Sequence, residues 1–397
     1  MNLFSWDRNL WMRVVAEGFV QTVFWMFFPF VAIYFSEVYS KETAGVLLGL
    51  PTIASIFATL LGGHLADRAG RRKTMYAGIF AQSAMFFLFL LTDRIWLQWI
   101  AFVGISCSYS LYLPAATAMI ADLTSERERR HVFAGVQTAF NIGVVAGPLL
   151  GSFLFAQNLS LLLLICGGVL FLYGLTILLF FRETTPASTR KELALETSKN
   201  GGPNILSGLK QMLSDRPFTL YLLACVLIAI VFMQTTLYLA VYLTELMPAG
   251  ANVYGWMLGW NGLLVILFSM RVAKWFKSIS DRNALLLSCL LHGVGLFSMA
   301  FTSNLWLLLL CMTLFCLGEM IRLPIQQSLI SKYAPEEKRG LYMGGYTLHF
   351  SIARLVAPLT IMLSGMISPL GVFSLLLFCA LLSAFTFWRL FRHLPAS

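Results

Sequence analysis

Three ionisable residues lie inside otherwise apolar stretches of this sequence. Glu319 follows Leu317-Gly318 and precedes Met320-Ile321, Arg322 lies three residues later, and Arg354 lies within a separate apolar run. A charge in apolar surroundings is costly, so each of these residues is a functional candidate. Desolvation favours the protonated form of a carboxyl group, so Glu319 is a candidate to bind and release a proton or a cation.

The charges near Glu319 leave alternatives open. Arg322 lies one helical turn away, so the two residues could instead form a permanent structural pair. Arg354 is either the counter-ion of Glu319, which we favour, or a contact for an anionic substrate. Glu17 lies one turn after Arg13, and a pair between them is slightly favoured over a substrate contact.

The histidines and cysteines in the apolar stretches are expected to be packing residues. His292 and His349 lie in apolar stretches and can titrate near neutral pH, but a lone buried histidine is more often a hydrogen-bonded packing residue. The seven cysteines show no metal-ligand spacing, so we expect packing roles and no metal site. The chain has no GxxxxGKS/T, HExxH, GxSxG or CxxC pattern, so we expect neither ATP hydrolysis nor another enzymatic activity.

The elements that hold these residues are predicted to be membrane spans. Of the 397 residues, 58% are hydrophobic and 12% are charged, whereas soluble domains are about 25% charged. This composition argues against a soluble enzyme, a disordered chain and a nucleic-acid binder. The apolar runs are continuous and do not alternate, which favours helices over barrel strands. We expect twelve spans, near residues 11–36, 43–66, 74–92, 95–121, 132–156, 159–181, 218–245, 252–276, 283–303, 305–331, 341–366 and 369–391.

The net charge of +10 comes from basic residues that cluster at alternate ends of the spans. If the amino terminus is cytoplasmic, 24 of the 28 Lys and Arg residues lie at or near cytoplasmic ends. Lys41 and Arg94 lie outside, and Arg322 and Arg354 lie within spans. This distribution follows the positive-inside rule. We therefore expect a multi-pass protein of the plasma or inner membrane with both termini in the cytoplasm and no nucleic-acid partner.

An internal duplication divides the spans into two sets of six. Residues recur at a shift of 210, including Trp96 with Trp306 and Pro148 with Pro358. Two such halves bind a substrate at their interface near the bilayer midplane, which is a transporter architecture. The expected parts are an N-terminal six-helix half (residues 1–181), a cytoplasmic linker (182–216) and a C-terminal six-helix half (217–397).

The loop after the second span carries a specific motif. It reads Gly63-His64-Leu65-Ala66-Asp67-Arg68-Ala69-Gly70-Arg71-Arg72-Lys73 and resembles the signature loop of the major facilitator superfamily. With the twelve spans and the midpoint linker, the resemblance covers the whole chain. It implies a cytoplasmic charge latch for the outward-open state, and the alternative is a positive-inside loop without a latch. The expected residues are Gly63, Asp67, Arg68, Gly70, Arg71 and Asp122, with Gly63 allowing close approach of a neighbouring helix and Gly70 permitting a tight turn.

The fifth span contains Gly143-x-x-x-Gly147-Pro148-x-x-Gly151. Small residues four apart permit close helix packing, and Pro148 bends the helix. After the signature loop, this segment looks like the antiporter motif of the 12-helix drug/proton antiporters, so we favour antiport over symport. That family often has an arginine earlier in the fourth span, but this chain reads Phe102-Val103-Gly104 there. Proton coupling must therefore rest on other groups.

In the superfamily, the first, fourth, seventh and tenth spans line the central cavity. Here those spans and the eighth offer mostly aromatic residues with few polar groups, which suits bulky lipophilic cations held by cation–π contact and a carboxylate. The candidates are Glu17, Gln21, Trp25, Phe28, Tyr109, Tyr112, Gln234, Tyr238, Phe315, Trp256 and Trp260, and packing between helices is the alternative for each. The Leu-Gly-Glu context of Glu319 also resembles the tenth span of Gram-positive multidrug exporters.

The sequence thus predicts an all-α membrane protein with the major facilitator superfamily fold, in which twelve transmembrane helices form two pseudo-symmetric halves. The favoured function is proton-coupled efflux of lipophilic, cationic, drug-like compounds by alternating access, with Glu319, Arg322 and Arg354 as coupling residues. A proton gradient would take the place of a cofactor. The alternatives are a carrier of one metabolite or lipid with an anionic group, and a non-transporting sensor or scaffold. The expected partners are small lipophilic substrates and membrane lipids, and the protein is expected to be a monomer.

Overall fold

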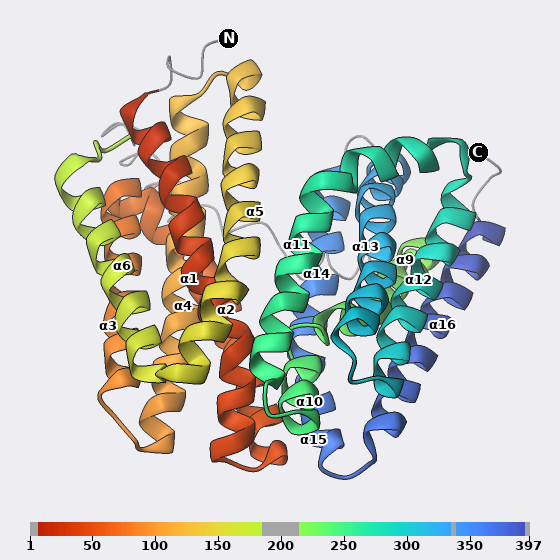
Figure 1. The fold of residues 1–397 in the computed structure, drawn as a ribbon. Helices are drawn as coiled ribbons and strands as arrows, with labels where there is room; N and C mark the ends of the chain where they lie inside the picture. Colours follow the sequence, from red (N-terminus) through yellow and green to blue (C-terminus); the bar gives the residue numbers. More distant parts are fainter. Residues whose placement is uncertain (1–6, 185–213, 335–338, 394–397) are drawn as a thin grey trace. The chain divides into compact units, whose positions relative to one another are not determined.

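The computed structural model of the protein describes residues 7–184, 214–334 and 339–393. Within those ranges all regular structure is helical and there is no strand (Figure 1). Twelve helical segments are long and apolar enough to cross a membrane, which confirms the predicted number of spans. The α-helices are α1 (Arg8–Val38), α2 (Lys41–Ala69), α3 (Arg71–Leu90), α4 (Ile95–Leu123), α5 (Glu126–Gln157), α6 (Leu159–Phe180), α9 (Arg216–Met233), α10 (Tyr238–Leu246), α11 (Gly250–Trp275), α12 (Asp281–Ser298), α13 (Leu305–Tyr333), α14 (Arg339–Val356), α15 (Leu359–Ser364) and α16 (Pro369–His393).

Two of the predicted spans are interrupted helices. The seventh divides into α9 and α10 at residues 234–237, and the eleventh divides into α14 and α15 at Pro358. The buried Gln234 amide group donates to the carbonyl oxygens of Ile230 (3.1 Å) and Ala357 (3.3 Å). Its own oxygen accepts from the Thr360 hydroxyl (2.6 Å). These bonds satisfy backbone groups that a bilayer would leave without partners.

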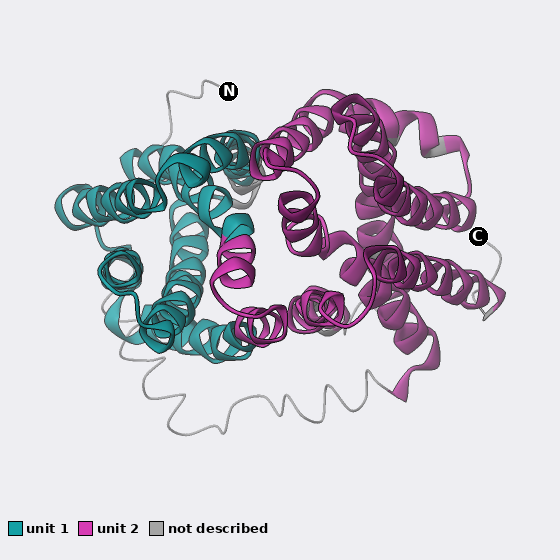
Figure 2. Ribbon diagram, turned by 60° about the horizontal axis from the view of Figure 1, so that its bottom comes forward, with its two compact units in different colours: residues 1–30, 50–202 teal, residues 31–49, 203–397 magenta. Residues whose placement is uncertain are grey.

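The chain forms two compact units, which Figure 2 colours separately. Unit 1 comprises Met1–Phe30 and Leu50–Gly202, and unit 2 comprises Val31–Gly49 and Pro203–Ser397. The junction of α1 and α2 therefore belongs with the helices of unit 2. There the Lys41 ammonium group lies 2.8 Å from the Glu245 carboxylate.

The two units repeat one helix arrangement. In unit 1, α3 packs along α4 and α6, and in unit 2, α12 packs along α13 and α16. Each of these three helices in unit 2 begins 210 residues after its counterpart in unit 1, the shift already visible in the sequence. The paired starts are Arg71 and Asp281, Ile95 and Leu305, and Leu159 and Pro369.

Candidate functional site

Glu319 lies on α13 and is half-buried. Its Oε2 atom accepts a hydrogen bond from Asn261 Nδ2 on α11, at 3.4 Å. The Asn261 carbonyl in turn lies 3.6 Å from the Cys316 thiol. Within the described residues, Asn261 is the hydrogen-bond partner of Glu319, and no ion pair joins this carboxylate to Arg322 or Arg354.

Arg322 and Glu319 lie one helical turn apart on α13, but no ion pair joins them among the described residues. Arg322 is fully buried, and its Nη1 atom donates to Gln326 Oε1 at 2.9 Å. Its guanidinium carbon lies 5.5 Å from the centre of the Phe232 ring on α9. The structure therefore does not form the permanent Glu319–Arg322 pair.

Arg354 is exposed on α14, and the ion pairs between described residues do not include one that joins it to Glu319. His292 and His349 are fully buried, and the Nδ1 atom of each donates to a carbonyl oxygen of its own helix, that of Ser288 (2.9 Å) and that of Tyr346. This bonding agrees with the packing role expected for both histidines.

A second polar cluster lies in unit 1, between α1 and α4. Arg13 Nη1 donates to the Glu17 carboxylate, and their side chains are 2% and 5% exposed. Gln21 Nε2 donates to Glu17 Oε1 (2.8 Å) and to the Tyr109 hydroxyl (2.9 Å). The Arg13 guanidinium also lies 5.5 Å from the centre of the Tyr112 ring. The structure thus forms the expected Arg13–Glu17 pair and extends it into a network.

The glycines of the expected antiporter motif pack α5 against α1. A Cβ atom at Gly143 would lie 2.5 Å from the Gln21 Cβ, and one at Gly147 would lie 2.5 Å from the Trp25 Cβ. A Cβ at Gly151 would lie 2.5 Å from the carbonyl oxygen of Met26. Only glycine permits this approach, so the motif sets the position of the helix that carries Arg13, Glu17 and Gln21.

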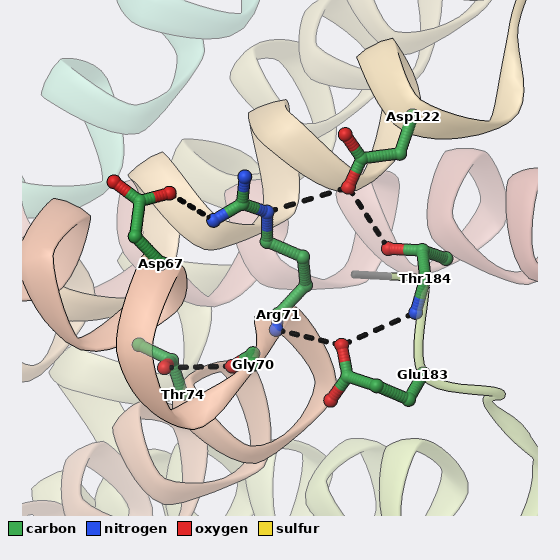
Figure 3. Close-up of polar contacts among 7 residues, drawn as sticks. All are labelled: Asp67, Gly70, Arg71, Thr74, Asp122, Glu183 and Thr184. Atoms are coloured by element: carbon green, nitrogen blue, oxygen red, sulfur yellow. Dashed lines mark hydrogen bonds and ion pairs between the residues drawn. The ribbon is translucent and has the colours of Figure 1, made fainter. Parts of the chain in front are cut away.

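The signature loop forms a polar network around Arg71 (Figure 3). Arg71 Nη1 donates to Asp67, and Arg71 Nε donates to Asp122 Oδ2 at 3.3 Å. The network joins the end of α2, the start of α3 and the end of α4. It therefore joins the three charged residues Asp67, Arg71 and Asp122 of the six that the resemblance implied for a charge latch. Arg68 is exposed and does not belong to these contacts.

Two further residues of this network lie three and four residues after the end of α6. Glu183 Oε1 accepts from the backbone N–H groups of Arg71 (2.9 Å) and Thr184 (3.1 Å), and the Thr184 hydroxyl donates to Asp122 (3.1 Å). The Glu183 carboxylate lies at the amino end of α3, where the helix dipole favours a negative charge. Neither residue was predicted from the sequence, although an Arg-Glu-Thr run directly after an apolar span was the available signal.

The predictions for the two glycines of this loop differ in how they agree with the structure. Gly70 has φ +105°, and a Cβ there would lie 2.3 Å from the Glu183 carboxylate, so the turn requires glycine, as expected. Gly63 was expected to allow a close helix approach, but a Cβ there would meet no atom within 4 Å. The close approach belongs to Gly62, whose Cβ would lie 2.5 Å from the Leu111 carbonyl oxygen. One residue turns a helix by about 100°, so the neighbouring glycine faces α4 instead.

The remaining cavity candidates fall into different environments. Gln234, Tyr238 and Phe315 are buried within unit 2. Trp256 and Trp260 are exposed on α11, and Trp260 Nε1 donates to the Thr313 hydroxyl at 2.9 Å. In unit 1, Phe28 stacks on Phe24 and Trp25 meets the Phe24 ring edge-on, while Tyr109 and Tyr112 belong to the α1–α4 cluster.

The second half carries a reduced form of the signature-loop contact. Asp281 on α12 lies 3.7 Å from the Lys332 ammonium on α13. These are the repeat positions of Arg71 and Asp122, with the charges exchanged. Nearby, the Asp215 carboxylate, which caps α9, accepts from the hydroxyls of Tyr333 and Tyr342, each at 2.7 Å. Burial and the hydrogen bond to Asp215 raise the pKa of Tyr342 to about 12, so this hydroxyl stays a donor.

Comparison with known proteins extends over the whole chain. The sequence model described as Major Facilitator Superfamily matches residues 14–248 and 247–397. A Na(+), Li(+), K(+)/H(+) antiporter of Planococcus maritimus is 35% identical, covering 99% of this chain and 98% of its own length. Multidrug resistance protein MdtH of Proteus mirabilis is 25% identical, covering 81% of this chain and 78% of its own.

Solved structures share the fold at lower identity. The peptide transporter POT in complex with sulfate superposes with a TM-score of 0.76 at 15% identity, covering 99% of this chain and 95% of the other. A variant of the nucleoside transporter NupG superposes with a TM-score of 0.80 at 14% identity, covering 96% and 100%. The matched proteins are transporters and not enzymes. On the sequence match over both halves, the chain belongs to the Major Facilitator Superfamily.

Proposed function

We propose that this protein is a cation/proton antiporter in which Glu319 binds the proton and the cation in turn. The observation that carries the proposal is the environment of its carboxylate. It lies half-buried on a membrane-spanning helix, accepts a hydrogen bond from the neutral Asn261, and forms no ion pair among the described residues. A charged carboxylate in such a place is costly until a proton or a cation neutralises it.

Mutually exclusive occupancy of one carboxylate is sufficient for exchange. A proton and a cation cannot both neutralise the same charge, so binding of one favours release of the other. Alternating access of the two halves of a superfamily transporter then delivers each to the opposite side of the membrane. We place the protein in the plasma or inner membrane with both termini in the cytoplasm, on the distribution of its basic residues.

Two classes of cation have support. The 35% identical antiporter of Planococcus maritimus, named for Na(+), Li(+) and K(+), favours alkali metal cations. The 25% identical MdtH multidrug resistance protein and the aromatic residues of α1, α4 and α11 favour lipophilic organic cations. Both classes would be neutralised by the same carboxylate, so the proposal for Glu319 does not depend on the choice between them.

The test uses purified protein in proteoliposomes with an acidic interior and a fluorescent pH indicator. External Na(+), Li(+), K(+) or tetraphenylphosphonium is added, and cation-driven loss of the pH gradient is recorded. Wild-type protein is expected to dissipate the gradient with at least one cation, and Glu319→Gln is expected to lose that response. Glu37→Gln, which changes an exposed glutamate on α1, is the matched control and is expected to behave as wild type.

The cation that responds assigns the substrate class. Dissipation by alkali cations alone supports the first class, and dissipation by tetraphenylphosphonium alone supports the second. Unchanged dissipation by Glu319→Gln would refute the role of this residue, and a wild-type protein that responds to none of the four cations would refute antiport.

A further inference from the structure

We propose that unit 2 contains a binding site for one small monovalent anion at Arg322, either a halide or the carboxylate of a small solute. Arg322 is 0% exposed on α13, and its guanidinium group stays charged at any physiological pH. Its one hydrogen-bond acceptor among the described residues is the neutral Gln326 side chain. The nearest carboxylate along the helix, Glu319, is bonded to Asn261 on α11. Among the described residues, no carboxylate forms an ion pair with this buried cation.

The side-chain nitrogen atoms around Arg322 that lack a hydrogen-bond partner in the described part of the chain are all donors, so they require an acceptor. Arg322 Nε and Nη2 and Gln326 Nε2 are buried and have no hydrogen-bond partner among the described residues. These three nitrogen atoms can only donate, so the missing partner accepts hydrogen bonds. Gln326 is 0% exposed as well, so the partner must be small enough for an enclosed site. A halide or a carboxylate group meets both conditions.

Unit 1 shows how the same arrangement is neutralised by the protein itself. There Arg13 on α1 lies over the Tyr112 ring on α4. The repeat shift of 208 residues for the first helix relates Arg13 to Tyr221. The repeat shift of 210 residues for the fourth helix relates Tyr112 to Arg322. The arginine and the tyrosine have exchanged helices. In unit 1 the buried charge of Arg13 is paired with Glu17.

The counterpart of Glu17 in unit 2 is an uncharged residue. The shift of 208 places Cys225 there, one turn after Tyr221, as Glu17 lies one turn after Arg13. The Tyr221 hydroxyl donates to the carbonyl oxygen of Gln326 at 2.8 Å, on the helix that carries Arg322. Unit 2 has thus kept a buried arginine and lacks the carboxylate that neutralises its counterpart. A bound anion would supply that charge.

Water is the competing occupant. With Nδ1 donating to a carbonyl oxygen, the unpartnered Nε2 atoms of His292 and His349 are acceptors, and water molecules could connect them to the arginine donors. Water would satisfy the hydrogen bonds but would leave the charge uncompensated, and a buried charge is stable chiefly when paired. We therefore favour an anion. This inference does not depend on which cation the protein exchanges.

The test measures the melting temperature of the purified full-length protein in sodium chloride, sodium formate and sodium gluconate at equal ionic strength. Gluconate is too large for an enclosed site and serves as the reference. Chloride or formate is expected to raise the melting temperature in a saturable manner, by about 2 °C or more. A response to chloride alone identifies a halide site, and a response to formate identifies a carboxylate site. No response to either anion would overturn the proposal in favour of water.

Two substitutions at one position make the test specific. Cys225→Glu places a carboxylate where unit 1 has Glu17, so it should abolish the anion response. Cys225→Ser adds no charge and should keep it. A Cys225→Glu protein that responds like wild type would overturn the assignment to Arg322. Glu319→Gln, which is expected to stop antiport, should keep the anion response, so the two proposals fail independently.

Discussion

At the scale of single residues, the buried charges differ in how they are neutralised. Arg13 and Glu17 lie one helical turn apart and neutralise each other, and this local spacing made the pair predictable from the sequence. Glu319 was also evident, because it interrupts an apolar run. Its partner Asn261 was not, because a neutral amide on α11 comes into contact only through tertiary packing. The same limit applied to Glu183 and Thr184, whose contacts span different helices.

Loss of Glu17 alone is expected to destabilise the protein strongly. Glu17→Gln leaves the buried Arg13 guanidinium without its counter-ion, which costs about 3–5 kcal/mol when one member of a buried pair is removed. The measurement is the melting temperature of the purified protein. The double substitution Arg13→Met with Glu17→Leu removes both charges and should cost less than Glu17→Gln. A Glu17→Gln protein as stable as wild type would contradict the buried pair.

At the scale of helices, small residues decide which elements approach closely. The spacing of Gly143, Gly147 and Gly151 predicted tight packing but did not identify the partner, which the structure shows to be α1. For the signature loop, the sequence pointed to Gly63, and the structure assigns the contact to Gly62. Two adjacent glycines give no periodic signal in the sequence that identifies which of them faces the neighbouring helix. The interruption of the seventh span was not predicted, although the polar run Gln234-Thr235-Thr236 within an apolar stretch was the available signal.

Gly147→Ala is expected to disturb the α1–α5 contact. The new Cβ would lie 2.5 Å from that of Trp25, so the helices must separate, at a cost of about 1–3 kcal/mol. Gly168→Ala on α6 is the matched control, because its Cβ would meet no atom within 4 Å. Removing a helical glycine there should be neutral or stabilise the protein by up to about 1 kcal/mol. Thermal melting of both variants checks this, and equal stability of the two would contradict the packing assigned to the motif.

At the scale of the whole molecule, the duplication preserves contacts while exchanging their partners. Arg71 and Asp122 on α3 and α4 correspond to Asp281 and Lys332 on α12 and α13. The repeat, the twelve spans and the family were predictable because they rest on periodic apolar runs and a specific motif. The exchanged pairs were not predictable in this way. They become visible only when contacts in unit 1 are compared with those 210 residues later in unit 2.

Both chain termini are expected in the cytoplasm. The basic residues that give the positive-inside distribution include Arg72, which donates to the Ile177 carbonyl at 3.4 Å, and Arg8, which donates to the Phe180 carbonyl at 2.6 Å. These contacts stabilise the carboxyl end of α6, where the helix dipole also favours a positive charge. With the carboxyl terminus in the cytoplasm, a fluorescent protein fused to it should fluoresce. Alkaline phosphatase fused there should be inactive. The reverse pattern would contradict the orientation.

In the proposed mechanism one carboxylate, that of Glu319, exchanges a proton for a cation. The most direct measurement is proton release from purified protein in a weakly buffered detergent solution when the transported cation is added. Wild-type protein should release protons in a saturable manner, because the cation displaces the proton from Glu319. Glu319→Gln should release none. Proton release of equal size from the Glu319→Gln protein would contradict exchange at this carboxylate.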